Sequence, residues 1–199
     1  MTDVEYVINP YEEYALEQGV QLKEKYGGEV TVLTLGPEKS TQMIQKALAL
    51  GADNAIHLRT ASFPDDPSAV ARALAAELKD RQFDVLLFGK KGVDDDNHQV
   101  GEMVSELLGI PCATQIVKLD IKDGNAVAVR EVEGGSITIE TSLPLPLPAK
   151  RISQFQDTRP CENLWQHGRN LSRLKNQNHF PPFSKRSRCN ILHLDPKVG

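Results

Sequence analysis

The sequence predicts a three-layer α/β fold built on a mostly parallel sheet. In the first half of the chain, short apolar strand candidates alternate with amphipathic helix candidates, and Gly or Pro punctuates the connections between them. From about residue 113 the pattern changes to period-two runs joined by short turns, which predicts a small antiparallel β appendage.

The first helix is expected to begin after Asn9, which can cap it, with Pro10 at the first helical position and Glu12 reaching back to the cap. The Gly27-Gly28 pair ends that helix. The later candidates are, in chain order, a strand at 30–35, a helix at 38–50, a strand at 55–58, a helix at 67–79, a strand at 85–88, a helix after the loop 89–99, and antiparallel runs at 116–121, 126–132 and 136–141. We therefore expect an α/β core over residues 1–112 and an appendage of the same domain over residues 113–143.

Beyond residue 143 the periodicity stops. Residues 1–150 contain 14 Lys and Arg against 24 Asp and Glu, whereas residues 151–199 contain 9 against 3. A polar, basic stretch without apolar periodicity cannot bury a core, so residues 144–199 are expected to form a disordered or aberrant tail. Aromatic residues do not alternate with its basic ones, which argues against nucleic acid as a partner.

Bulk properties limit the class of protein. No apolar run is long enough to cross a bilayer, and the start lacks the pattern of a signal peptide, so we expect a cytoplasmic protein without membrane insertion. The three cysteines are far apart and form no metal-binding pair, which favours a reducing compartment. No catalytic triad, paired-carboxylate setting or zinc spacing is found. His57 is expected to be a core or edge histidine, and Cys112 a buried, inert thiol.

The most informative segment is the strand–loop–helix junction 83–109. Gly36 and Gly89 end two parallel strands, and ligands of such sheets bind beyond the carboxyl ends of the strands. The backbone N–H groups that open the following helix suit a phosphate. The run Asp94-Asp95-Asp96 leaves two other interpretations open: a solvated acidic loop whose carboxylates cap the helix, and a magnesium site.

Five segments in this order and spacing are similar to one known family. They are Asn9-Pro10-Tyr11-Glu12, Thr31–Pro37, Lys46–Asp53, Gly89–Gly109 and Arg130–Gly135. Together they resemble the β subunit of the electron transfer flavoproteins, and the resemblance runs from about Ile8 to Leu143. It implies a Rossmann-like sheet of the adenine nucleotide α-hydrolase type.

The resemblance also implies a function. Such a chain is an electron carrier subunit without catalytic residues of its own, which pairs with an α subunit, binds AMP and shares FAD with that subunit. In fatty acid oxidation, electrons pass from acyl-CoA and other dehydrogenases to a quinone oxidoreductase of the respiratory chain. The expected compartment is the cytoplasm of a bacterium, or the mitochondrial matrix of a eukaryote. A second FAD in place of AMP remains an alternative.

The residues that the resemblance assigns to the nucleotide lie in three places. They are Asn9, Pro10, Tyr11 and Glu12; Leu35 and Gly36; and Asp94, Asp95, Asp96, Asn97, His98, Gln99, Val100, Gly101, Glu102, Met103, Val104 and Ser105. Without the resemblance, the first group is simply a good helix start and the second an ordinary strand end. At Leu35 only the backbone can contact the ligand, because a leucine side chain has no hydrogen-bonding group.

The chain departs from the family at both ends. Relatives usually carry a longer segment before the Asn-Pro pair, including the first strand of the sheet and a nucleotide contact. In the tail, a shifted reading frame over Phe155–Pro160 permits Pro-Arg-Tyr-Pro-Ser-Leu, and over Asn163–Ser172 it permits Leu-Met-Ala-Ala-Arg-Lys-Lys-Pro-Ile. Both resemble the family's loop for docking on dehydrogenases. The hypothesis is a frameshift between about Leu143 and Pro148. Two other functions therefore stay open: a free-standing AMP or ATP sensor, and an inactive product of an altered gene.

Overall fold

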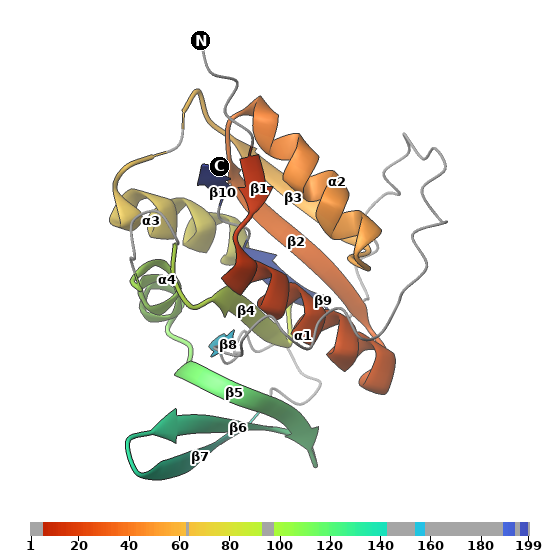
Figure 1. Cartoon of the computed structure of the whole chain (residues 1–199), viewed down its shortest axis with the longest axis vertical. Coiled ribbons are helices and arrows are strands. Elements are labelled where there is room, and N and C mark those ends of the chain that lie inside the picture. Colours follow the sequence, from red (N-terminus) through yellow and green to blue (C-terminus); the bar gives the residue numbers. More distant parts are fainter. Residues whose placement is uncertain are drawn as a thin grey trace.

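An eight-stranded sheet with helices on both faces organises the chain (Figure 1). The computed structural model describes residues 6–62, 64–92, 98–142, 154–157, 189–193 and 196–198. The strand order in the sheet is β3-β2-β9-β4-β8-β5-β6-β7, and β1 and β10 form a separate two-stranded sheet. The strands are β1 (Tyr6–Ile8), β2 (Glu29–Gly36), β3 (Asn54–Arg59), β4 (Val85–Gly89), β5 (Cys112–Lys122), β6 (Asn125–Val132), β7 (Gly135–Ser142), β8 (Gln154–Asp157), β9 (Cys189–His193) and β10 (Pro196–Val198).

The helices divide between the two faces of the sheet. They are α1 (Pro10–Tyr26), α2 (Thr41–Ala49), α3 (Pro67–Leu78) and α4 (Val100–Leu108), with a short 3-10 helix, η1 (Glu38–Ser40), before α2. Val32 and Leu87 belong to a buried cluster with residues of α1 and α2. Leu33 and Leu86 belong to a second cluster with residues of α3 and α4. Both faces of the parallel strands are therefore apolar, which confirms the predicted three-layer α/β fold.

The pairing changes from parallel to antiparallel along the sheet. All pairs from β3 through β2, β9, β4 and β8 to β5 are parallel, whereas β5-β6 and β6-β7 are antiparallel. Asp123 and Gly124 both have positive φ, 51° and 78°, as a two-residue hairpin turn of the I′ type requires. The predicted appendage is thus present. β5 belongs to both parts of the sheet, because its first residues pair with β8 and its later ones with β6.

The helix α1 begins and ends as its sequence predicts. The Oδ1 atom of Asn9 accepts a hydrogen bond from the N–H of Tyr11 at 3.1 Å, and Pro10 occupies the first turn. At the other end, Gly27 has a φ of 78°, and its N–H donates to the carbonyl of Lys23 at 2.8 Å. The apolar face of this helix is buried; it comprises Ala15, Leu16, Val20 and Leu22.

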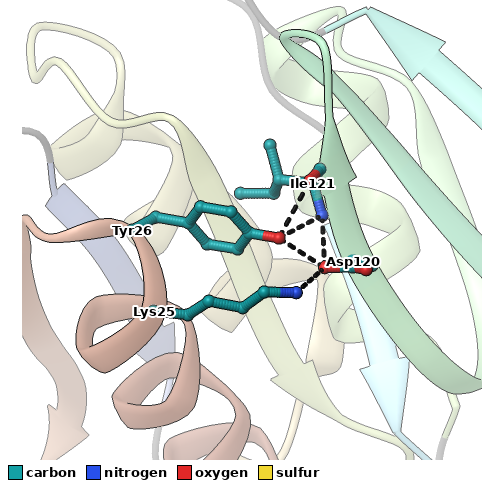
Figure 2. Close-up of polar contacts among 4 residues, drawn as sticks. All are labelled: Lys25, Tyr26, Asp120 and Ile121. Carbon is teal, nitrogen blue, oxygen red and sulfur yellow. Dashed lines mark hydrogen bonds and ion pairs between the residues drawn. The ribbon is translucent and has the colours of Figure 1, made fainter.

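A polar cluster ties the carboxyl end of α1 to the appendage. Figure 2 shows the Lys25 ammonium and the Tyr26 hydroxyl converging on the carboxylate of Asp120 in β5, at 2.7 Å and 2.5 Å. The same hydroxyl lies 2.9 Å from the carbonyl oxygen of Ile121. The Lys25 and Tyr26 hydrogen bonds hold the pKa of Asp120 well below its ordinary range, and the bond to Asp120 raises the pKa of Lys25.

Three segments of the tail are strands, although the sequence predicted no regular structure there. β8 pairs with β4 and β5, β10 pairs with β1, and β9 lies between β2 and β4. In β9, Leu192 is in register with Val32 on one side and Leu87 on the other. β9 therefore lies in the middle of the parallel part of the sheet (Figure 1). The rest of the predicted tail, 144–153, 158–188, 194–195 and 199, lies outside the described residues.

None of the helices in the described part of the chain is both long and apolar enough to cross a membrane.

Candidate nucleotide-binding corner

The carboxyl ends of β2 and β4 lie at the same edge of the sheet, because both strands run parallel to β9 between them. The chain leaves β2 toward β3 on one side, and on the other side the sheet continues from β4 through β8 to β5. The order of strands thus reverses direction between β2 and β4. At a reversal of this kind, α/β sheets bind ligands beyond the carboxyl ends of the strands.

Asn9 joins the start of α1 to the loop that follows β4. Its side chain is 1% exposed. While Oδ1 caps the helix through the Tyr11 N–H, Nδ2 donates to the carbonyl oxygen of Lys91 at 2.6 Å. A backbone donor on one side and a backbone acceptor on the other require the amide in this orientation. The helix start and the loop are therefore held together across 82 positions of sequence.

Glu12 makes a second connection between the same two elements. Its side chain is 2% exposed, and Oε2 accepts a hydrogen bond from the N–H of Gly89 at 2.8 Å. Beside it, the Lys91 ammonium lies 5.9 Å from the centre of the Tyr11 ring, within range of a cation–π contact. The first turn of α1 thus contacts the end of β4, and its Tyr11 ring lies against a cation of the loop.

At the end of β2, Leu35 and Gly36 have no side chain available for a ligand beyond the strand end. Leu35 is 5% exposed, because its side chain packs in the cluster formed with α3 and α4. The Gly36 carbonyl accepts hydrogen bonds from His57 Nε2 at 3.0 Å and from the Thr60 N–H at 3.1 Å. His57 is half-buried and bonds the backbone of the neighbouring strand end, consistent with the predicted edge histidine.

The predicted nucleotide segment after β4 is described only in part. Asp94, Asp95, Asp96 and Asn97 lie outside the described residues, and with them the acidic-loop and magnesium interpretations. His98 is half-buried and Gln99 is exposed just before α4. Among the residues that the structure does describe, no group of His, Cys, Asp or Glu is arranged to hold a metal ion.

Within α4 the predicted site residues separate into two kinds. Gly101 is buried in the first turn, whereas Glu102 is exposed. Val104 is fully buried, and the half-buried Met103 packs against the same cluster with α3. Ser105 is 1% exposed and donates from Oγ to the Gly101 carbonyl at 3.1 Å. The start of α4 therefore faces the loop, while Val104 and Ser105 serve packing.

The thiol of Cys112 differs from its prediction in one respect. The residue is exposed, so the expectation that it is buried is wrong. Desolvation nevertheless raises the pKa of its thiol, and the hydrogen bond with Ser105 offsets only part of this rise. A raised pKa keeps the thiol protonated, which agrees with the expected weak nucleophile. The exposure arises because Cys112 begins β5, where the chain emerges from α4.

Comparison with known proteins decides the family. A family model described as the electron transfer flavoprotein domain matches residues 1–149, which include every described residue of this corner. The chain belongs to the electron transfer flavoprotein family. A relative from Bacillus subtilis (strain 168), named electron transfer flavoprotein subunit beta, is 41% identical over 149 residues, covering 74% of this chain and 58% of that protein. The predicted resemblance to electron transfer flavoprotein β subunits is thus confirmed.

Other similar proteins carry different names. Protein FixA of Azotobacter vinelandii is 37% identical over 146 residues, covering 69% of this chain and 52% of that protein. The caffeyl-CoA reductase-Etf complex subunit CarD of Acetobacterium woodii is 34% identical over 156 residues, covering 77% of this chain and 59% of that protein. The chain spans little more than half the length of these electron transfer flavoprotein relatives.

Sequence reasoning missed one residue of the corner. Lys91, which accepts the Asn9 bond through its carbonyl, has no local signal, because its partner is 82 positions away. The sequence predicts that Gly89 ends a strand, but it does not show that Gly89 is the hydrogen-bond partner of Glu12.

Proposed function

We propose that this chain is the β-type subunit of a heterodimeric electron transfer flavoprotein and that it binds AMP where α1 and α4 begin, beyond β2 and β4. The observation that carries the proposal is the family match over residues 1–149, the part of the chain that forms this corner. The connections from Asn9 to Lys91 and from Glu12 to Gly89 support it, because they fix the loop that would hold the ligand.

The residues of the corner fit an anionic nucleotide. The first backbone N–H groups of α4 have no partner within the helix, and the helix dipole places positive potential there. Gly101 lacks a side chain that would keep a phosphate away from these groups. Lys91, a residue of the loop between β4 and α4, adds a cation. The residues proposed for this nucleotide site are Asn9, Pro10, Tyr11, Glu12, Leu35, Gly36 and residues 94–105.

The redox chemistry in this proposal belongs to FAD, which accepts and releases the electrons when it is bound between the two subunits. The chain's own residues bind the AMP, shape the surroundings of the flavin and exclude water from it. Acyl-CoA and other dehydrogenases would supply the electrons, and a quinone oxidoreductase would accept them, in the cytoplasm of a bacterium or in the mitochondrial matrix. The name of the Acetobacterium woodii relative, a subunit of a reductase complex, supports a role within an assembly.

Two further candidates rest on the end of the family match. It ends at residue 149, next to the proposed frameshift between Leu143 and Pro148. A chain without the family's docking loop would be a free-standing AMP or ATP sensor, or an inactive product. Sequencing the encoding DNA tests the frameshift: the idea fails if no insertion or deletion restores the family-like frame.

Co-expression with a matching α subunit tests the proposal. A stable heterodimer with a flavin spectrum, from which mass spectrometry recovers both FAD and AMP, is the expected result. Two FAD molecules and no AMP per heterodimer would mean that a second flavin occupies the nucleotide site. A colourless monomer whose melting temperature rises with AMP would favour the sensor. If neither species forms, the carrier and the sensor both fail.

A further inference from the structure

The carboxylate of Glu12 lies where a side chain of residue 89 would be. A Cβ atom built on Gly89 would lie 2.6 Å from Glu12 Oε1, 2.7 Å from Glu12 Cδ and 2.9 Å from the Glu12 main-chain nitrogen. Real Cβ atoms do not approach other atoms this closely. Position 89 is therefore glycine because Glu12 occupies the space, and the two residues interlock at the end of β4.

The burial of this carboxylate has a definite requirement. At 2% exposure Glu12 has lost almost all its water, and a buried charge is tolerated only when hydrogen bonds replace the lost solvation. The N–H of Gly89 supplies such a bond at 2.8 Å, and Glu12 also lies in the first turn of α1, where the helix dipole favours an anion. The Glu12 carboxylate thus accepts a hydrogen bond from the main chain of the protein itself.

We infer that the side chain of Glu12 positions the nucleotide corner and that its carboxylate does not bind the ribose of the nucleotide, an inference that rests on the proposed function of the corner. It fixes the last residue of β4 and so the direction in which the loop toward α4 leaves the sheet. Asn9 holds the same loop two residues further on, through the Lys91 carbonyl at 2.6 Å. One turn of α1 therefore sets the position of the loop through two independent bonds.

The alternative is a direct hydrogen bond from a ribose hydroxyl of the ligand to the Glu12 carboxylate. The two roles differ in how a mutation acts on different ligands. A positioning residue affects every ligand of the site equally, because it changes the loop. A residue that binds a ribose hydroxyl loses nothing further with a ligand that lacks this hydroxyl.

Calorimetric titration of the assembled protein with AMP, 2′-deoxy-AMP and 3′-deoxy-AMP separates the two roles. We expect Glu12→Ala to weaken all three ligands by the same factor, about tenfold, which corresponds to one lost hydrogen bond to a charged group. Glu12→Gln keeps an oxygen that can accept the Gly89 bond and is expected to retain affinity within about threefold. A loss for AMP that exceeds the loss for either deoxy ligand by more than about threefold overturns the inference.

Two further variants serve as a control and as a substitute in this test. Glu13→Ala, in the same helical turn, removes an exposed ion pair with Lys46 and is expected to leave AMP binding unchanged. Glu12→Asp keeps the charge but withdraws the carboxylate from Gly89, so it is expected to weaken all three ligands as Glu12→Ala does. It carries the test if Glu12→Ala does not fold. Wild-type affinity in Glu12→Asp overturns the inference.

The interlock itself can be measured without any nucleotide. Gly89→Ala is expected to lower the melting temperature strongly in the wild-type background and less in the Glu12→Ala background. The reason is that Glu12→Ala removes the atoms at 2.6 Å and 2.7 Å, while the main-chain nitrogen at 2.9 Å remains. Equal losses in the two backgrounds overturn the interlock. If the wild type shows the interlock but binds no AMP, the proposed function fails while the structural basis of the inference stands.

Discussion

Replacing Asn9 tests how strongly the start of α1 and the loop after β4 are joined. Asn9→Ala removes two hydrogen bonds: the cap of the helix through Tyr11 and the bond to the Lys91 carbonyl. A helix cap contributes about 1 kcal/mol, and a side-chain bond to the backbone about 1 kcal/mol. Because Asn9 is 1% exposed, water does not replace either partner. The free energy of unfolding is therefore expected to fall by about 2 kcal/mol.

Asn9→Asp separates these two contributions. A carboxylate can still accept from the Tyr11 N–H, and a negative charge suits a helix start, so the cap is retained. No carboxylate oxygen can donate to the Lys91 carbonyl, so the bond to the loop is lost. Because the second carboxylate oxygen would face the Lys91 carbonyl where almost no water reaches, we expect Asn9→Asp to lose at least about 1 kcal/mol through the Lys91 side alone and to weaken AMP binding as much as Asn9→Ala does.

Urea denaturation followed by circular dichroism measures the stability, with an unchanged slope as evidence that the compactness of the native and denatured states is unaffected. Titration calorimetry measures the affinity for AMP. Gln21→Ala is the matched control, because it loses an exposed bond to Glu17 in the same helix and is expected to stay within about 0.5 kcal/mol of the wild type. Wild-type stability and affinity in Asn9→Asp would refute the role assigned to the bond with Lys91.

Three further predictions concern other parts of the chain. The pKa of Asp120 is lowered in the folded state, so its bonds to Lys25 and Tyr26 stabilise the fold above the ordinary carboxyl pKa of about 3.9. This stabilisation decreases as the pH falls through and below that value. The difference in melting temperature between wild type and Asp120→Asn should therefore shrink between pH 7 and pH 2, and a constant difference contradicts this. Because the pKa of Cys112 is raised, peptide mass spectrometry should show slower alkylation of this thiol by iodoacetamide at pH 7 than of an unstructured peptide, and equal rates contradict it. Ending the chain before β9 should lower the melting temperature by more than about 10 °C, equivalent to about 3 kcal/mol at this length, because β2 and β4 lose the strand between them. A chain that ends after His193 is the control. Equal melting temperatures of the two chains would mean that β9 does not complete the sheet.

The parallel part of the fold could be predicted because its signals are local. Asn9, Pro10 and the Gly27-Gly28 pair mark the ends of α1 within the sequence of the helix itself. Buried strands such as β2 consist of continuous β-branched and apolar residues, and Asp123-Gly124 is the turn that a hairpin demands. These features require no knowledge of distant contacts.

The tail strands could not be predicted for the opposite reason. β9 has five residues, too few for a period to be recognised, and polar residues flank its two central apolar ones. Its conformation depends on the edges of β2 and β4, each of which supplies a row of backbone groups. Strand propensity depends largely on such tertiary context, so composition alone predicts a tail without strands for this segment.

The candidate site divides in the same way. The sequence indicated the helix start and the strand ends, whose roles follow from residue type. It did not indicate that Glu12 bonds Gly89, because this contact joins positions 77 apart. A carboxylate three residues after a cap has two possible backbone partners, and only the packing of α1 on β4 brings Gly89 within its reach.

The helix α1 also connects the candidate corner to the appendage. Its first turn is tied to the loop after β4 by Asn9 and Glu12, and its last turn is tied to the appendage by Lys25 and Tyr26. These anchors lie about 25 Å apart along a helix of 17 residues. Its middle is buried against the sheet, so the helix cannot slide without breaking apolar contacts as well. Besides the sheet itself, which continues through β5, α1 therefore fixes the appendage relative to the candidate corner, because polar contacts at both of its ends hold segments that are far apart in the sequence.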